Sequence, residues 1–163
     1  MRQLKLLIVA VSGAAALASA GVALGHSAHA STASTTVSAK KTSLGTILVT
    51  SSGKTLYLDK GDKPPHFACT GGCLAIWPPL KANGTLKASG GAIAGDLGKV
   101  KGPGGEQVTY KGHPLYTFVS DTKGSPTSGE GQNGFFVVST SGSMITKSTK
   151  ATGSSGSTPS TGW

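Results

Sequence analysis

Short apolar runs separated by turn residues predict that this chain folds into β-strands. The continuous run 135–138 is the strongest strand signal, and 144–146 is expected to pair back with it. Glycines are too frequent between 83 and 105 for a helix, because each one costs about 1 kcal/mol relative to alanine. We therefore expect loops there, with one strand near 99–101.

Two β-hairpins are predicted, each by a pair of apolar runs around a glycine that adopts a positive φ. The strands and turn glycines are 47–50, Gly53 and 55–58 in the first hairpin, and 106–110, Gly112 and 114–119 in the second.

The two hairpins belong to a sequence unit that occurs twice, at an offset of 59 residues. The ungapped alignment also places Trp77 on Phe136. A unit that buries its apolar face poorly alone can bury it against its twin. The predicted fold class is therefore all-β, a small single domain built from two pseudo-symmetric hairpin-based repeats and flanked by disordered tails. The repeat motif comprises Gly53, Leu56, Tyr57 and Asp62 in one copy, and Gly112, Leu115, Tyr116, Phe118 and Asp121 in the other. One shared core is expected, formed by Leu56, Tyr57, Trp77, Leu115, Tyr116, Phe118, Phe136 and Val138.

The N-terminal part of the chain predicts export. Residues 1–30 combine a positive start, an apolar stretch and small residues before Ser31, which is typical of a signal peptide. We expect a secreted, extracellular or cell-envelope protein without a stable transmembrane anchor after cleavage; a retained anchor is the alternative.

The segments beside the repeats contain almost no large apolar side chains. Residues 31–43 are accordingly predicted to be a Ser/Thr-rich linker and 147–163 a disordered Ser/Gly/Thr tail. The two-repeat β domain is expected at 44–146, with repeats at about 45–80 and 104–140.

The charge of the exported chain is strongly basic. After residue 30 it holds thirteen lysines, no arginine and six acidic residues, a net charge of +7. Lysine is a compact point charge without the bidentate geometry of arginine, so specific nucleic-acid recognition is not expected. Anionic cell-wall polymers or lipid headgroups are the candidate partners; the alternative is that the lysines only keep the surface soluble.

Cys69 and Cys73 form the sharpest local motif, followed by the aromatic-proline motif Trp77-Pro78-Pro79. In an exported protein an even pair of cysteines favours a disulfide. The alternative is that both thiols stay reduced and bind copper as Cu(I), with His66 as a third ligand. Otherwise no cofactor is expected.

Catalytic signatures are missing, so the prediction is a non-enzymatic module. His113 faces Lys54 in the alignment and is interpreted as a turn residue, because the mismatch argues against a symmetric catalytic role. Asp62 and Asp121 stay in register and are interpreted as acceptors of backbone N–H groups that fix the exit of each strand.

Three stretches together resemble a bacterial family of secreted repeats of unknown function, whose members are often lipoproteins with a Tyr-x-(Phe/Trp/Tyr)-x-x-Asp motif. They are 53–57, 69–80 and 107–121. The resemblance implies an exported two-repeat module and no reaction. Two departures stand out: Asp59 occupies the aromatic position that Phe118 keeps in the second copy, and no cysteine follows the apolar stretch to carry a lipid anchor.

Overall fold

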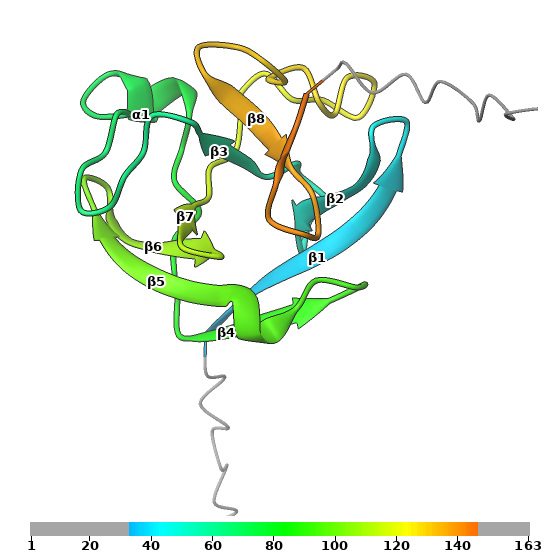
Figure 1. Cartoon of the computed structure of the whole chain (residues 1–163), viewed down its shortest axis with the longest axis horizontal. Coiled ribbons are helices and arrows are strands. Elements are labelled where there is room, and N and C mark those ends of the chain that lie inside the picture. The colour runs from blue at the N-terminus through cyan, green and yellow to red at the C-terminus, as the bar shows by residue number, and fades with distance from the viewer. Residues whose placement is uncertain (1–32, 147–163) are drawn as a thin grey trace, which may run out of the picture. The chain divides into compact units, whose positions relative to one another are not determined.

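The computed structural model describes residues 33–146 and shows the expected all-β fold (Figure 1). The predicted signal peptide, the first two residues of the predicted linker and the predicted C-terminal tail lie outside the described residues. The strands are β1 Ser34–Thr42, β2 Gly45–Thr50, β3 Tyr57–Asp59, β4 Thr85–Ser89, β5 Leu97–Gly102, β6 Gly105–Tyr110, β7 His113–Pro114, β8 Phe135–Val138 and β9 Met144–Ile145. Two single-turn helices accompany them, α1 Cys73–Ile76 and the 3-10 helix η1 Ala94–Asp96. In this described part of the chain, no helix has the length and apolarity needed to cross a bilayer.

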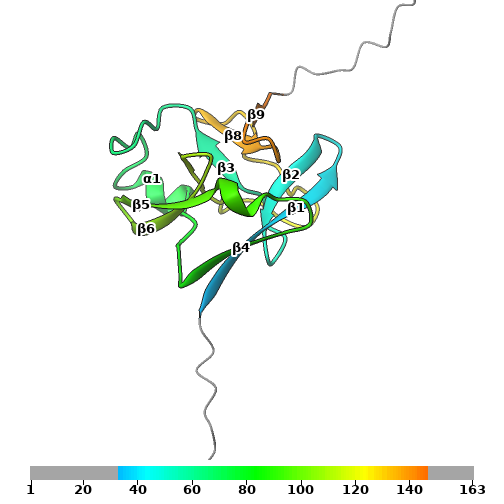
Figure 2. The ribbon, with the colours of Figure 1, turned by 60° about the horizontal axis from the view of Figure 1, so that its bottom comes forward.

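The strands form three sheets of three strands, with the orders β2-β1-β4, β3-β8-β9 and β5-β6-β7. Figure 2 shows β1 between β2 and β4. The only parallel pair among these strands is β1 with β4, and β9 pairs back with β8 as predicted. Single bridges link strands to neighbouring segments, including Ile47 of β2 with Ser139 directly after β8 and Lys81 with Gln107 of β6.

The prediction that 31–43 is a linker is wrong from Ser34 onward, because these residues form β1. Thr35 and Val37 are buried, at 9% and 0% exposure. Single alternating apolar positions give a weak strand signal, and here Val37 is buried because it belongs to an apolar cluster with Leu56 and Val138. The sequence between the repeats also contains a second unpredicted strand, β4, whose partner β1 lies about fifty residues earlier.

The two repeats start earlier than predicted, at the hairpins β1–β2 and β5–β6. These hairpins have matching registers, which close on Thr42 with Gly45 and on Gly102 with Gly105. The two predicted turns exist, but their strands mainly pair elsewhere: β3 pairs with β8, not with β2. At the tip of the second turn Lys111 and Gly112 both have positive φ, of 49° and 82°, as a tight hairpin requires.

Equivalent hydrogen bonds give the true alignment of the repeats. The Leu56 N–H donates to the Leu48 carbonyl (3.0 Å), and the Leu115 N–H donates to that of Val108 (2.9 Å). Further along, the Val138 N–H donates to the Leu56 carbonyl (3.1 Å) and the Leu80 N–H to the Leu115 carbonyl (2.8 Å). The offset therefore falls from 60 at Leu48 to 59 at Leu56 and 58 at Leu80. The ungapped alignment is wrong beyond the central motif, because the connecting turns differ by one residue.

The apolar interior forms two clusters rather than the single core that was predicted. One contains Leu56 and Leu115 and the other contains Tyr57 and Tyr116, since neighbouring residues of an extended chain point to opposite sides. Each cluster draws side chains from both repeats. Of the predicted core residues, Phe136 is only half-buried, and its neighbour Phe135 is buried instead.

Candidate functional site

The two motif tyrosines meet at the centre of the molecule. The Tyr57 N–H donates to the Tyr116 carbonyl, and the Tyr116 N–H donates to the Tyr57 carbonyl, both at 2.9 Å. Both side chains are fully buried. The reciprocal pair makes the surroundings of the two tyrosines equivalent and places the pseudo-twofold axis between them.

The motif aspartates cross between the repeats to reach these tyrosines. The Tyr57 hydroxyl donates to Oδ2 of Asp121 (2.8 Å), and the Tyr116 hydroxyl donates to Oδ2 of Asp62 (2.7 Å). Each tyrosine is thus bonded to the aspartate of the other copy. Burial, and next the hydrogen bond to that aspartate, raise the pKa of both hydroxyls above their ordinary value of 10.0. The tyrosine hydroxyls are therefore neutral and act as hydrogen-bond donors, as expected for residues that hold the two repeats together.

The second oxygen of each aspartate has the backbone role expected from the sequence. Oδ1 of Asp62 accepts the Ala68 N–H (2.8 Å), and Oδ1 of Asp121 accepts the N–H and hydroxyl of Ser128 (3.0 and 2.9 Å). Each carboxylate therefore fastens the loop after its own strand to the tyrosine of the other repeat. The crossing itself was not predicted; its only signal in the sequence was the constant spacing of Tyr and Asp in both copies.

An aromatic stack lies on the same axis. Trp77 and Phe135 are parallel, with ring centroids 3.8 Å apart. Tyr57 meets the Trp77 ring edge-on at 5.3 Å, and Tyr116 meets the Phe135 ring in the same way at 5.3 Å. The counterpart of Trp77 is thus Phe135, not Phe136. Pro78 and Pro79, which follow Trp77, lie beside residues 116–117 without forming a regular strand. The Pro78 carbonyl accepts the Thr117 N–H (2.9 Å), and Pro79 forms a single β-bridge with Tyr116.

Asp59 breaks the symmetry of this stack. Phe118 lies against Trp77 with ring centroids 4.3 Å apart, whereas the same position of the first copy holds Asp59, opposite Phe135 in the register of β3 with β8. Asp59 is 8% exposed and accepts the Gly61 N–H at 2.8 Å. Burial raises its pKa, and the neighbouring carboxylate of Asp62 adds to the effect.

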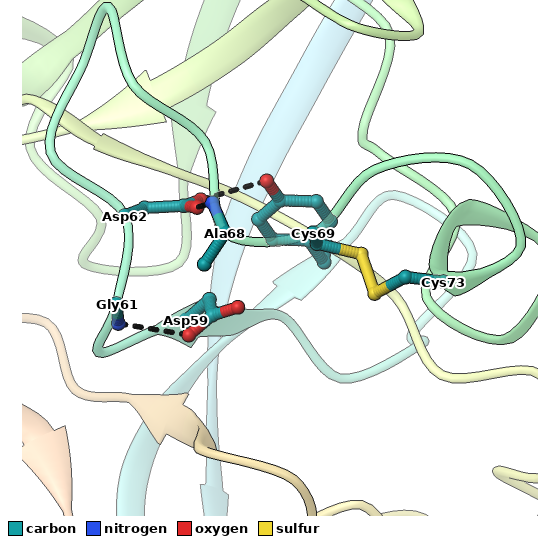
Figure 3. The surroundings of a disulfide bond; sticks show 7 residues. Asp59, Gly61, Asp62, Ala68, Cys69 and Cys73 are labelled. Atoms are coloured by element: carbon teal, nitrogen blue, oxygen red, sulfur yellow. Dashed lines mark hydrogen bonds between the residues drawn. A yellow bond between two sulfur atoms is a disulfide. The ribbon is translucent and has the colours of Figure 1, made fainter.

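Cys69 and Cys73 form a disulfide beside this region, with 5.4 Å between their Cα atoms. Figure 3 shows that the bond starts at the residue after Ala68, whose N–H the Asp62 carboxylate accepts, so the disulfide closes the loop that follows the one held by Asp62. As a disulfide the pair offers no thiolate to copper. His66 is exposed, and its backbone pairs with Lys63. Within residues 33–146 no group of three His, Cys, Asp or Glu side chains is arranged to hold a metal ion.

Each crossed pair borders a pocket between the aspartate of one repeat and the hairpin turn of the other. The first, here called the lysine pocket, has a volume of about 510 Å³. Its lining includes Lys40, Ser52, Lys54, Asp121, Lys123 and Pro126. The second, the acidic pocket, has a volume of about 440 Å³ and includes Asp59, Lys60, Asp62, His113 and Met144. Lys54 and His113, which the sequence aligned, hold corresponding places in the two pockets.

Acidic and basic groups are separated between interior and surface. Asp59, Asp62 and Glu130 are buried, while Asp96 and the exposed Glu106 form ion pairs with Lys111 and Lys99. All eleven lysines of the described residues are exposed. Nine of them have no carboxylate within ion-pair distance in this part of the chain: Lys40, Lys41, Lys54, Lys60, Lys63, Lys81, Lys87, Lys101 and Lys123. The surface is consequently more basic than the net charge suggests.

Comparison with known proteins gives one match. The model of a family described as "secreted repeat of unknown function" matches residues 38–81 and 99–138. The two matched segments begin inside β1 and β5, in agreement with the repeat boundaries of the structure. No curated protein and no solved structure matches the chain significantly.

Proposed function

The chain belongs to the family of secreted repeats of unknown function, and from this premise we propose that it is a non-enzymatic, extracytoplasmic module that binds anionic cell-wall polymers. The observation that carries the proposal is the separation of charge. Nine exposed lysines of the described part have no carboxylate partner, whereas three of its six carboxylates are buried. Such a surface attracts polyanions over distances comparable with the Debye length, about 10 Å at 0.1 M salt.

The motif residues support a non-enzymatic role. Both carboxylates that the repeat keeps in register are already bonded to a buried tyrosine and to backbone N–H groups. Acid–base catalysis by a carboxylate pair needs two environments that separate the pKa values, whereas both of these carboxylates accept the same kinds of hydrogen bond, from a tyrosine hydroxyl and from a backbone N–H. The duplication therefore explains these residues as parts of the scaffold.

The copper alternative has no comparable support. It needs Cys69 and Cys73 as thiolates, and the structure joins them in a disulfide. It stays a prediction for the reduced protein, for which anaerobic Cu(I) titration of the parent and of Cys69→Ser is the appropriate measurement.

Co-sedimentation with isolated cell walls tests the proposal. The exported chain is mixed with walls over a salt series, and the bound fraction is measured. We expect binding at low salt that falls steeply towards 1 M salt, where the Debye length is about 3 Å. Walls from which the anionic polymers have been extracted are the control and should bind much less. Retention that is insensitive to salt, or no retention at low salt, would contradict the proposal.

A further inference from the structure

We infer that the lysine pocket is a specific subsite for a phosphate group of such a polymer, an inference that rests on the proposed function and refines it. The pocket gathers Lys40, Lys54 and Lys123 from three segments that are distant in the sequence: strand β1, the turn after β2 and the loop after Asp121. None of the three has a carboxylate within ion-pair distance in the described residues. Because these three lysines line one pocket, the lysine pocket differs from the rest of the surface, where the lysines are scattered.

The walls of the pocket are held by hydrogen bonds within the turn and between the turn and the loop. The hydroxyl of Thr55, which is 1% exposed, donates to the Pro126 carbonyl and holds the loop against the turn of the other repeat. The turn is closed by the Gly53 N–H to the Thr50 carbonyl (2.9 Å) and the Lys54 N–H to the Thr50 hydroxyl (3.1 Å). Lys54 and Lys123 are therefore carried by backbone that is held in place, which lowers the ordering required when an anion binds.

The one carboxylate of the pocket does not compete for these lysines. Oδ2 of Asp121 accepts the Tyr57 hydroxyl (2.8 Å), and Oδ1 accepts the Ser128 N–H and hydroxyl (3.0 and 2.9 Å). Three lysines against one internally bonded aspartate leave the pocket with an excess of positive charge. The acidic pocket, its pseudo-symmetric counterpart, has Asp59 and Asp62 against Lys60 and a histidine. The lysine pocket and the acidic pocket, which the duplication places at corresponding positions, can therefore be compared within one molecule.

Phosphate on a polymer fits the lining better than phosphate on a lipid. Apart from the ring of Pro126 and the lysine stems, the pocket is formed by Ser, Gly, Asp and Thr residues. None of the exposed large apolar side chains of the described part lines it: Ile76, Ile93, Val119 and Met144. Insertion into a bilayer needs apolar contacts beside the basic ones, so a water-soluble chain of phosphodiesters is the expected occupant.

Two triple variants with the same change of charge test the subsite. The site variant is Lys40→Gln, Lys54→Gln and Lys123→Gln; the control variant is Lys63→Gln, Lys87→Gln and Lys101→Gln, at exposed lysines outside the pocket. The probe is bis(glycero)phosphate, a soluble phosphodiester, followed by NMR chemical-shift titration of the exported chain. We expect the site variant to bind about tenfold more weakly than the parent and the control about twofold more weakly, since only the former loses direct charge-assisted hydrogen bonds. Shifts should cluster on the turn 51–54 and the loop 122–126.

The failures of the two proposals are distinguishable. Equal weakening in both variants, with wall binding intact, would overturn the subsite and leave diffuse lysine attraction in place. Equal affinity for acetate and the phosphodiester would overturn the assignment to phosphate. Co-flotation with phosphatidylglycerol vesicles that the site variant abolishes would assign the pocket to lipid and contradict the polymer. Absence of wall binding by the parent overturns the proposed function itself.

Discussion

The crossed hydrogen bonds explain why a tyrosine and an aspartate recur at the same spacing in both copies. Each Tyr–Asp hydrogen bond needs one residue from each repeat, so a loss in either copy leaves a polar group of the other copy without its partner, and three of these four groups, all but Asp121, are buried. Leaving a buried polar group without its hydrogen-bond partner costs more free energy than the bond itself contributes. The motif is therefore required by the assembly of the two repeats.

A double-mutant cycle measures this coupling. Tyr57→Phe and Asp121→Ala should each lower the free energy of unfolding by about 2 kcal/mol, since each removes the hydrogen bond between the tyrosine hydroxyl and the carboxylate. The double variant should cost about 1 kcal/mol less than the sum, because the residues share one bond. The measurement is urea unfolding of the three variants and the parent.

Tyr57 and Asp62 provide the matched control, since they lie in the same copy and are not bonded to each other. Their effects should add to within about 0.5 kcal/mol. Coupling within a copy that equals the coupling between copies would contradict the crossed arrangement.

Asp59 should lower stability at neutral pH. Its pKa is raised by burial, so between the ordinary value of 3.8 and the raised value the folded state holds more protons than the unfolded state. The free energy of unfolding accordingly falls as pH rises through that window. Asp59→Asn, which keeps an acceptor for the Gly61 N–H, should raise the melting temperature at pH 7, and the difference should vanish as pH approaches 3.8. A gain that persists unchanged in acid would rule out the charge as its cause.

Among the elements, those built from contiguous apolar residues were predictable and those defined by remote partners were not. The run 135–138 forms β8, and the glycine turns lie where the sequence indicated them. Strands β1 and β4 carry few large apolar residues, and β4 is a strand because it lies beside β1, which is itself paired with β2. The shift from Phe136 to Phe135 has a related cause: a one-residue difference in a connecting turn exchanges the buried and exposed faces of a strand.

Strand β1 should therefore be essential although its sequence suggests a linker. Val37→Ala removes two methyl groups from a site with 0% exposure, next to both β2 and β4, and should lower the free energy of unfolding by about 2 kcal/mol. Lys41→Ala, at an exposed position of the same strand, should change it by less than about 0.5 kcal/mol. If Val37→Ala and Lys41→Ala lowered the free energy of unfolding, measured by thermal unfolding, by equally small amounts, β1 would contribute little to the stability of the fold.

For the whole molecule, the buried tyrosines set an alkaline limit to stability. Both hydroxyls have a raised pKa, so above pH 10.0 the unfolded state loses protons that the folded state keeps. Stability is then present below pH 10.0 and falls as pH rises above it. Tyrosinate absorbance from Tyr57 and Tyr116 should appear together with the loss of the folded circular-dichroism signal. Full ionisation of all three tyrosines in a still-folded protein would contradict this expectation.

The interlocking of the repeats also predicts that neither copy folds alone. Residues 31–91 would lose β8, the partner of β3, and residues 92–146 would lose Leu80, whose carbonyl accepts the Val108 N–H at 2.8 Å. Both apolar clusters would be divided between the fragments. Each fragment should give a poorly dispersed NMR spectrum, and mixing them should restore the dispersed spectrum of the intact domain, because the crossed Tyr–Asp bonds need no covalent link between the copies. A dispersed spectrum from either fragment alone would show that the repeats are independent units, and their duplication would then need an explanation other than a shared interior.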